Sequence, residues 1–342
     1  MDNLNDASPP SLPESETSEE FPQSVAQPEV VVPQVTTSQG SEFWPLFLFL
    51  AFILGLGSGY LLWGRVPNNR DNPSATIASP VSTPTPSINQ VTLPDSYTLP
   101  VSFGDIGPRL LAAGAIDYDQ FVQVYHQAGQ PLTADQLAIL TQGSNEPIVI
   151  NRENAYFLLN FFWAVGLTNQ NTLLTEGPMQ QYSKGDIGGF ASTGGWTIGA
   201  KPAVELYAST PLIKLTPEQQ ARLEEVAQAV YRPCCDNPTA FPDCNHGMAM
   251  LGLLELMAAQ GATVDEMFTT AKYVNAFWFP QQTLELAVLF KVSQSQDFAD
   301  VDARELVGPN LSSGTGFQRV HQWLADKGLL EQAPNNGNNC GV

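Results

Sequence analysis

The longest uninterrupted apolar stretch of the chain runs from residue 43 to residue 63. Its sequence, FWPLFLFLAFILGLGSGYLLW, holds 21 residues without a charge. At a rise of about 1.5 Å per residue, such a helix spans the roughly 30 Å hydrocarbon core of a bilayer. Trp44, Tyr60 and Trp63 lie near its ends, where amphipathic rings prefer the headgroup level. The run is too long for a secretory signal peptide and lacks a basic n-region. We therefore predict a single-pass transmembrane helix over 43–63 that anchors the protein in a membrane.

Two glycines within this apolar run offer a contact surface for a second copy of the helix. Gly55 and Gly59 have the GxxxG spacing, which lets two membrane helices approach closely. A homodimer through Gly55 and Gly59 is therefore one hypothesis. The alternative is that the glycines only reflect the high frequency of glycine in membrane helices.

The segments on either side of this helix are polar and show no sustained hydrophobic period. Residues 1–42 contain eight acidic residues and no Lys or Arg, so we predict a disordered acidic tail. Residues 64–99 are rich in Ser, Thr and Pro, which is typical of an extended linker or stalk. Residues 334–342 are dominated by Asn and Gly and are predicted to form a flexible tail.

The orientation in the membrane has arguments on both sides. Arg65 and Arg70 follow the apolar run, and the positive-inside rule would keep that side in the cytoplasm. The Ser/Thr/Pro-rich linker is of the kind that holds an extracytoplasmic domain away from a bilayer, and long domains translocate largely regardless of charge. We therefore predict a protein of the cell membrane with a cytoplasmic N-terminus and an extracytoplasmic C-terminal domain.

From residue 100 onward, hydrophobic positions recur with the period of a helix and follow helix start signals. The start signals comprise an N-cap residue, two capping boxes and a proline at the first helical position. They are Asp117, Thr133 with Gln136, Thr263 with Glu266, and Thr216 with Pro217.

The segment that follows Asn151 is apolar nearly all the way round, which indicates a central buried helix. Only Pro147–Ile150 and a few Thr/Val patches resemble strands. We therefore predict an all-α, multi-helix globular domain over 100–333, behind the transmembrane helix and the stalk. A hydrophobic content of 43% is enough for a core of its own.

The charge and the glycine pattern exclude several classes of function. A formal net charge of -20 with 14 Lys and Arg makes nucleic acid an unsuitable partner, because phosphate contacts need clustered cations. Residues 184–201 contain six glycines but neither a Walker A loop nor a dinucleotide fingerprint. We expect this glycine-rich segment to lie against the cysteine-containing stretch, with close backbone approach.

Chemistry concentrates between residues 231 and 250, in YRPCCDNPTAFPDCNHGMAM. This stretch holds three of the four cysteines and one of the three histidines. Three thiolates and an imidazole are the donors of a closed tetrahedral zinc site, although the spacing is not that of a standard zinc finger. The stretch therefore predicts a metal site with the ligands Cys234, Cys235, Cys244 and His246.

Neighbouring residues bear on the identity of the metal and on the geometry of the site. Met248 and Met250 add thioethers, which would favour Cu(I), whereas core packing is the more common fate of Met. Zinc or copper is therefore the expected cofactor. Asp243 is placed to accept the ring N–H of His246 and orient it. A helix is predicted to start beside Cys244, where the helix dipole would lower the pKa of its thiol.

Two alternatives to a metal site stay open. Cys244 could form a disulfide with Cys234 or Cys235, which an extracytoplasmic compartment would favour; the remaining cysteine could then pair only with Cys340. Alternatively, Cys244 could be the nucleophile of a thiol enzyme, redox or hydrolytic, with His246 as its base. Whether the protein is an enzyme is therefore left open.

The stretch PCCDNPTAFPDCNHGMAMLGLLELMAAQG, at 233–261, resembles a signature of uncharacterised membrane-anchored bacterial proteins. It is also remotely similar to the PCYCGC-motif proteins of bacterial envelopes, in which clustered cysteines and a histidine precede a helix. The spacing departs from that motif, since Cys234 and Cys235 are adjacent and Cys244 is distant. The resemblance implies an envelope protein with a cysteine site, and it brings no defined activity with it.

Overall fold

A computed structural model describes residues 91–330 of the chain. The predicted acidic tail, transmembrane helix and flexible tail lie outside these residues, as do most of the predicted linker, Gly55, Gly59 and Cys340. Within 91–330, every helix is too short or too polar to cross a bilayer.

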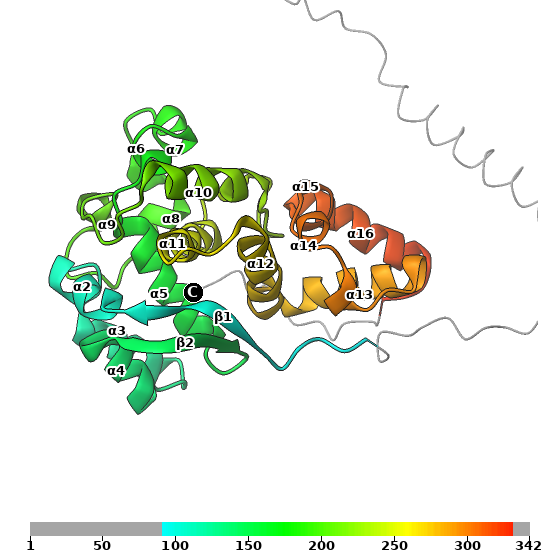
Figure 1. The fold of residues 1–342 in the computed structure, drawn as a ribbon, viewed down its shortest axis with the longest axis horizontal. Helices are drawn as coiled ribbons and strands as arrows, with labels where there is room; N and C mark the ends of the chain where they lie inside the picture. The colour runs from blue at the N-terminus through cyan, green and yellow to red at the C-terminus, as the bar shows by residue number, and fades with distance from the viewer. Residues whose placement is uncertain (1–90, 331–342) are drawn as a thin grey trace, which may run out of the picture. The chain divides into compact units, whose positions relative to one another are not determined.

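The described chain is mostly helical (Figure 1). Its first part contains β1 (Ser96–Gly104), α2 (Ile106–Ala113), α3 (Tyr118–Gln127), α4 (Ala134–Gln142), β2 (Ser144–Asn151) and α5 (Ala155–Thr168). Short elements follow: α6 (Thr172–Thr175), α7 (Pro178–Tyr182), η2 (Ile187–Gly189), α8 (Ala191–Gly194) and α9 (Ala203–Leu206). The last part contains α10 (Pro217–Ala229), α11 (Asn245–Ala259), α12 (Val264–Trp278), α13 (Pro280–Gln294), η3 (Phe298–Asp300), α14 (Ala303–Leu306), α15 (Pro309–Ser312) and α16 (Gly314–Asp326).

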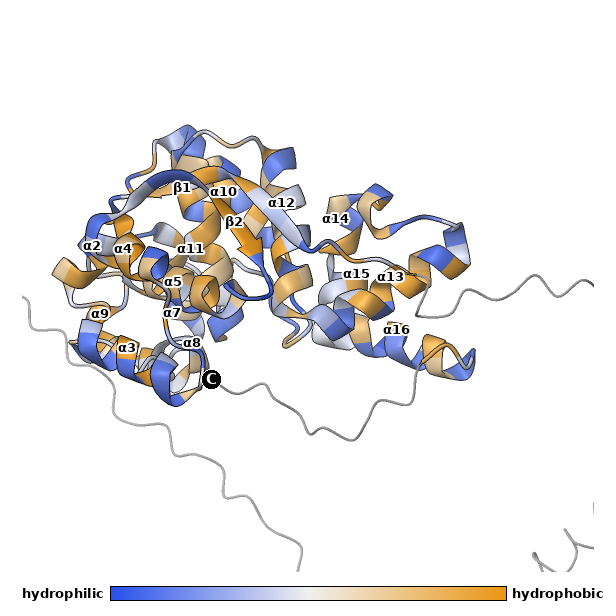
Figure 2. Ribbon diagram, turned by 90° about the horizontal axis from the view of Figure 1, so that it is seen from below, coloured by the Kyte–Doolittle hydropathy of each residue, from blue (hydrophilic) through white to orange (hydrophobic). Residues whose placement is uncertain are grey.

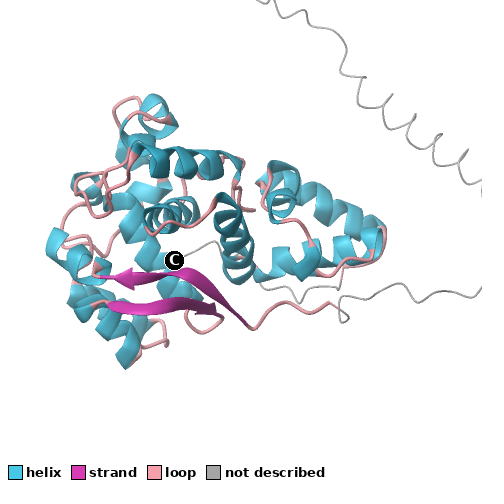
Figure 3. Cartoon of the chain, viewed as in Figure 1, coloured by secondary structure: helices cyan, strands magenta, loops and turns pink. Residues whose placement is uncertain are grey.

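The prediction of an all-α domain is correct for most of the described chain but misses a small sheet. β1 and β2 form a two-stranded antiparallel sheet (Figure 3), with Ser96 opposite Asn151 and Gly104 opposite Ser144. β2 includes the strand-like patch Pro147–Ile150. β1 begins inside the range predicted as linker. Every second residue from Leu99 onward, namely Leu99, Val101 and Phe103, points into the core, which is the pattern of a strand with one buried face.

Side chains from other elements satisfy backbone groups on the outer edges of this sheet. The Gln260 amide accepts a hydrogen bond from the Ser102 N–H at 3.0 Å and donates one to the Ser102 carbonyl at 2.8 Å. On the other strand, Asn154 donates to the Val149 carbonyl at 2.7 Å. Pro147 contributes no N–H at all. These contacts occupy edge groups that a further strand would otherwise need for pairing.

The helix starts that the sequence indicates are confirmed. Reciprocal capping boxes form at Thr133 and Thr263, and a third forms at Thr216, where Pro217 occupies the first turn. Asp117 caps α3 by accepting from the Gln120 N–H. These caps are local in sequence, which is why their positions follow from sequence alone.

Two central helices, α5 and α11, lie side by side in the middle of the described chain (Figure 1). Nearly every residue of α5 is buried, as predicted, and so are most residues of α11. By contrast, orange and blue alternate around outer helices such as α3 and α16 in Figure 2. The two helices touch backbone to backbone, because a Cβ at Gly166 would overlap the Met248 carbonyl and one at Gly252 would overlap the Phe162 carbonyl. This packing fixes the start of α11, which carries the candidate site.

Candidate metal centre

The cysteine loop, defined here as residues 230–244, connects α10 to α11 and is held by backbone hydrogen bonds to several elements. The Tyr231 N–H donates to the Val307 carbonyl at 2.8 Å, and the Ala240 N–H donates to the Ala227 carbonyl at 2.8 Å. The glycine-rich segment lies against the loop as expected, since the Ser192 N–H donates to the Asp243 carbonyl at 3.1 Å. These hydrogen bonds give the loop a defined path.

The loop also supports the start of α16. The Gly314 N–H donates to the Cys235 carbonyl at 2.9 Å, and the Asp236 carboxylate accepts from the backbone N–H and the hydroxyl of Thr315, each at 2.7 Å. These hydrogen bonds to the first turn of α16 lower the pKa of Asp236. Residues next to the cysteines thus connect the site to the C-terminal helices.

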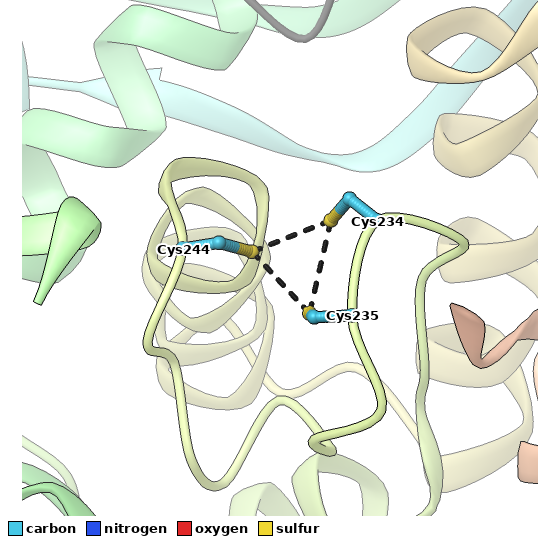
Figure 4. A group of neighbouring side chains, drawn as sticks. All are labelled: Cys234, Cys235 and Cys244. Atoms are coloured by element: carbon cyan, nitrogen blue, oxygen red, sulfur yellow. Dashed lines mark hydrogen bonds between the residues drawn. The ribbon is translucent and has the colours of Figure 1, made fainter. Parts of the chain in front are cut away.

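The structure brings three of the four predicted ligands together. Cys234 and Cys235 on the loop face Cys244 at the start of α11 (Figure 4). Their sulfur atoms are 3.4 Å apart for Cys234 and Cys244, 3.6 Å for Cys235 and Cys244, and 3.7 Å for Cys234 and Cys235. Two thiolates bound tetrahedrally to one zinc ion at about 2.3 Å are about 3.8 Å apart. The three sulfurs therefore lie within metal-binding distance of a common point.

Cys244 occupies the N-cap position of α11, as the sequence indicates. Its Sγ accepts hydrogen bonds from the Gly247 N–H at 3.3 Å and from the Arg232 Nε–H at 3.3 Å. Hydrogen bonds from the thiols of Cys234 and Cys235, together with the Arg232 charge, lower the pKa of Cys244 well below its ordinary value. Hydrogen bonds to the other two sulfurs raise the pKa of Cys234. Of the three thiols, Cys244 therefore has the surroundings that most favour the thiolate, which is the form that binds metal.

Arg232 was not among the residues that sequence reasoning selected, yet its guanidinium lies at the centre of the loop. The side chain is 1% exposed and contacts several loop oxygens. It donates to the carbonyls of Asn237 at 2.6 Å and Phe241 at 3.3 Å, and it forms an ion pair of 3.0 Å with Asp243. Its position two residues before Cys234 is the sequence feature that could have identified it as part of the site. A charged residue there would ordinarily be expected to face solvent.

The Asp243 carboxylate has a different partner from the predicted one. One oxygen accepts from Arg232 and the other accepts from the Asn237 amide at 2.7 Å. Sequence reasoning placed Asp243 beside the ring of His246. The buried guanidinium takes that carboxylate instead, because a buried charge needs a counter-charge more than a neutral imidazole needs an acceptor.

His246 is not part of the sulfur group in the described chain. Its ring packs on Phe279, with centroids 4.4 Å apart, and lies 6.1 Å from the ring of Trp278. Burial lowers the pKa of His246 to about 4, while the Cys244 charge acts in the opposite direction. The imidazole is therefore neutral at physiological pH, which is the protonation state that a metal ligand requires.

The two methionines after His246 lie in the hydrophobic core. Met248 is 0% and Met250 is 1% exposed, and both pack in the main cluster of apolar side chains. This is the alternative that the sequence left open for them. The donors that the structure gathers are thus thiols without thioethers.

A cavity of about 900 Å³ lies elsewhere, between α3, α4, β2 and the first residues of α5. Aromatic side chains such as Tyr125 and Tyr156 line it, together with acidic groups such as Glu146 and Glu153. None of the described residues that line it is a cysteine or a histidine. The metal-ligating chemistry of the described chain is therefore separate from this cavity.

The fold and the site together define a mostly helical domain with a cysteine triad, which is Cys234, Cys235 and Cys244. The triad lies where the cysteine loop meets the start of the central helix α11. Comparison with protein-family models, with curated proteins and with solved structures finds no match to this chain. The geometry of the triad is therefore the feature of the described chain that bears on its function.

Proposed function

We propose that this protein binds a soft or borderline metal ion, zinc or copper, through Cys234, Cys235 and Cys244. The observation that supports this most is the spacing of the three sulfurs, 3.4–3.7 Å, which is close to the spacing of thiolates on one zinc ion. The hydrogen bonds to the Cys244 sulfur also support the proposal, because metal-bound ligands are commonly oriented by such hydrogen bonds from neighbouring groups. His246, or a ligand from solution, supplies the fourth position.

The test is metal analysis of the full chain, purified under reducing conditions and without chelator, alongside a count of free thiols. Binding through the triad predicts one ion per chain and cysteines that stay reduced. Substituting Cys244→Ser should weaken binding so that the purified variant holds well under one ion per chain, whereas Cys340→Ser, which removes a cysteine outside the triad, should leave the occupancy unchanged. Full metal occupancy in the Cys244→Ser variant would reject this ligand set. The variant His246→Gln shows whether the imidazole takes the fourth position.

A second function, that of a thiol enzyme using Cys244, is supported by the lowered pKa of this thiol and by its two N–H contacts. The same measurements separate it from metal binding, because an enzyme thiol would be free, reactive and without a metal ion. A disulfide between Cys244 and Cys234 or Cys235, the third hypothesis, would leave neither a metal ion nor three free thiols.

We also propose that the apolar run 43–63 anchors the protein in the cell membrane, with the cysteine triad on the extracytoplasmic side. The support is the length and uncharged composition of that run. Digestion of intact cells with an added protease tests the orientation. Cleavage of the C-terminal domain is the expected result, and its full protection would reverse the orientation.

A further inference from the structure

The guanidinium of Arg232 connects one sulfur of the triad to the rest of the cysteine loop. Its Nε–H donates to the Cys244 sulfur, and its two terminal nitrogens donate to the loop oxygens of Asn237, Phe241 and Asp243. Such a fixed fork of donors loses little freedom on forming each bond, unlike a lysine ammonium. Arg232 thus links the Cys244 sulfur to three oxygens of the cysteine loop.

We propose that Arg232 is the positioning residue of the metal centre and acts through Cys244. This inference rests on the proposed function of the triad. The guanidinium orients the Cys244 sulfur toward the other two and supplies the positive charge that the metal–thiolate group needs. Arg232 itself does not touch the ion.

The charge of the site supports this role. Three thiolates around one divalent ion carry a net charge of -1, and such a charge in a partly buried site is costly unless it is paired. Arg232 provides one positive charge at 3.3 Å from the sulfur and is itself almost fully buried. Asp243, whose side chain is 24% exposed, pairs with the Nη2 atom of the guanidinium and is partly solvated.

Gly247 supports the same conclusion, because its backbone lies directly against the guanidinium. Its backbone N–H donates to the Cys244 sulfur, and a Cβ at this position would overlap the guanidinium of Arg232. The absence of a side chain at Gly247 therefore makes the contact between Arg232 and Cys244 possible. The variant Gly247→Ala displaces the guanidinium while it keeps every charge and every cysteine, and it places a good helix former in α11.

The alternative is that Arg232 only stabilises the fold of the loop. In that case its loss would disturb Cys234 and Cys235 as much as Cys244. If it acts through Cys244, its loss should remove one sulfur from the ion and leave the other two. The number of bound sulfurs therefore separates the two roles.

The experiment uses Co²⁺ as a spectroscopic probe of the full chain, followed by competition with Zn²⁺. Arg232→Met and Gly247→Ala should each bind Co²⁺ about 10- to 100-fold more weakly than the unmodified chain, as changes next to metal ligands commonly do. The intensity of the sulfur-to-cobalt charge-transfer band should fall by about one third, since one of three sulfurs is lost. Cys244→Ser should give the same spectrum, and the double variant Arg232→Met with Cys244→Ser should be no weaker than Cys244→Ser.

Lys272→Met is the matched control for the loss of a buried cation. The Lys272 side chain is 3% exposed, and its ammonium donates to the carbonyls of Ala299 and Val301, away from the triad. This variant should bind Co²⁺ as the unmodified chain does. If Arg232→Met does not fold, as judged by circular dichroism, Gly247→Ala provides the test.

Co²⁺ binding with unchanged affinity and spectrum in the Arg232 or Gly247 variant would overturn this inference and leave the proposed function standing. Additive losses in the double variant would also overturn it, because they would show that Arg232 acts independently of Cys244. If the unmodified chain binds neither Co²⁺ nor Zn²⁺, the proposed function itself fails, and the role of Arg232 fails with it.

Discussion

The Nε atom of Arg232 lies 3.3 Å from the Sγ atom of Cys244, and the arginine side chain that makes this contact is 1% exposed. A charge this far from water is stable only with partners on several sides. The loop provides them by folding around the guanidinium, with two carbonyls and the Asp243 carboxylate directed at it. The same folding brings Cys234 and Cys235 to Cys244. The triad and the buried cation are therefore parts of one arrangement.

The ion pair between Arg232 and Asp243 should contribute measurably to stability. In Asp243→Asn, the buried guanidinium of Arg232 loses its carboxylate partner. The new side chain has one acceptor oxygen in place of two, so it cannot accept from both Arg232 and the Asn237 amide. We expect the free energy of unfolding to fall by about 1–3 kcal/mol, measured by urea denaturation. Asp265→Asn is the matched control, since Asp265 pairs with Arg304 on the surface and water screens that pair. Equal effects of the two substitutions would contradict a special role for the buried pair.

Metal binding should stabilise the folded chain, because the unfolded chain does not hold the three sulfurs together. At free Zn²⁺ equal to 100 times the dissociation constant, the free energy of unfolding should rise by about 2.7 kcal/mol. Cys235→Ser should lose this gain, and Cys340→Ser should keep it. The measurement compares urea midpoints of chelator-treated and Zn²⁺-loaded protein. Identical midpoints in the unmodified chain would argue against a metal site in the triad.

The close contact of α5 and α11 should make Gly252 intolerant of any side chain. In Gly252→Ala, the new methyl overlaps the Phe162 carbonyl, so the two helices must move apart. We expect a loss of about 1–3 kcal/mol in the free energy of unfolding, although alanine is the better helix former. Gly314→Ala is the control, because its new Cβ meets its neighbours at ordinary contact distances of about 3.5 Å. A stabilised Gly252→Ala variant would show that this interface is looser than described.

Glu255 should make stability depend on pH. Burial raises the pKa of Glu255 well above its ordinary value, and the nearby side chains of Asn169 and Asn171 offset only part of this rise. Both carboxyl oxygens lack a hydrogen-bond partner in the described chain. The native state therefore keeps a proton that the unfolded chain loses above about pH 4.3. Because the native state binds more protons, the free energy of unfolding should fall as the pH rises from about 4.3 toward the raised pKa.

The variant Glu255→Gln tests this dependence, since an amide is uncharged at every pH. Compared with the unmodified chain, it should be similar in stability near pH 4 and more stable near pH 8. Urea denaturation at pH 4, 6 and 8 gives the comparison, and Glu146→Gln, a change at an exposed glutamate, is the matched control. If the free energy of unfolding depends on pH in the same way in Glu255→Gln and in the unmodified chain, groups other than Glu255 cause that dependence.

Local sequence was enough to predict the helix starts and the buried character of α5. A capping box such as the one at Thr133 involves residues three positions apart. The apolar residues on all sides of α5 lie within one continuous stretch of sequence. The strand β1 was missed because Leu99, Val101 and Phe103 alternate over a stretch too short and too rich in polar residues to stand out. Its pairing with β2 joins residues that are 40 to 55 positions apart, from Gly104 with Ser144 to Ser96 with Asn151.

The sequence by itself determined which residues could act as soft donors, because three cysteines fall within eleven positions and a helix starts at the third. Only the tertiary structure decided how they are arranged. It placed the ring of His246 on Phe279, and it buried Arg232 beside Cys244. The physical reason is that a helix cap depends on neighbours along the chain, whereas burial of a charge or a ring depends on packing between distant segments. The arrangement of the donors is therefore a property of the folded loop.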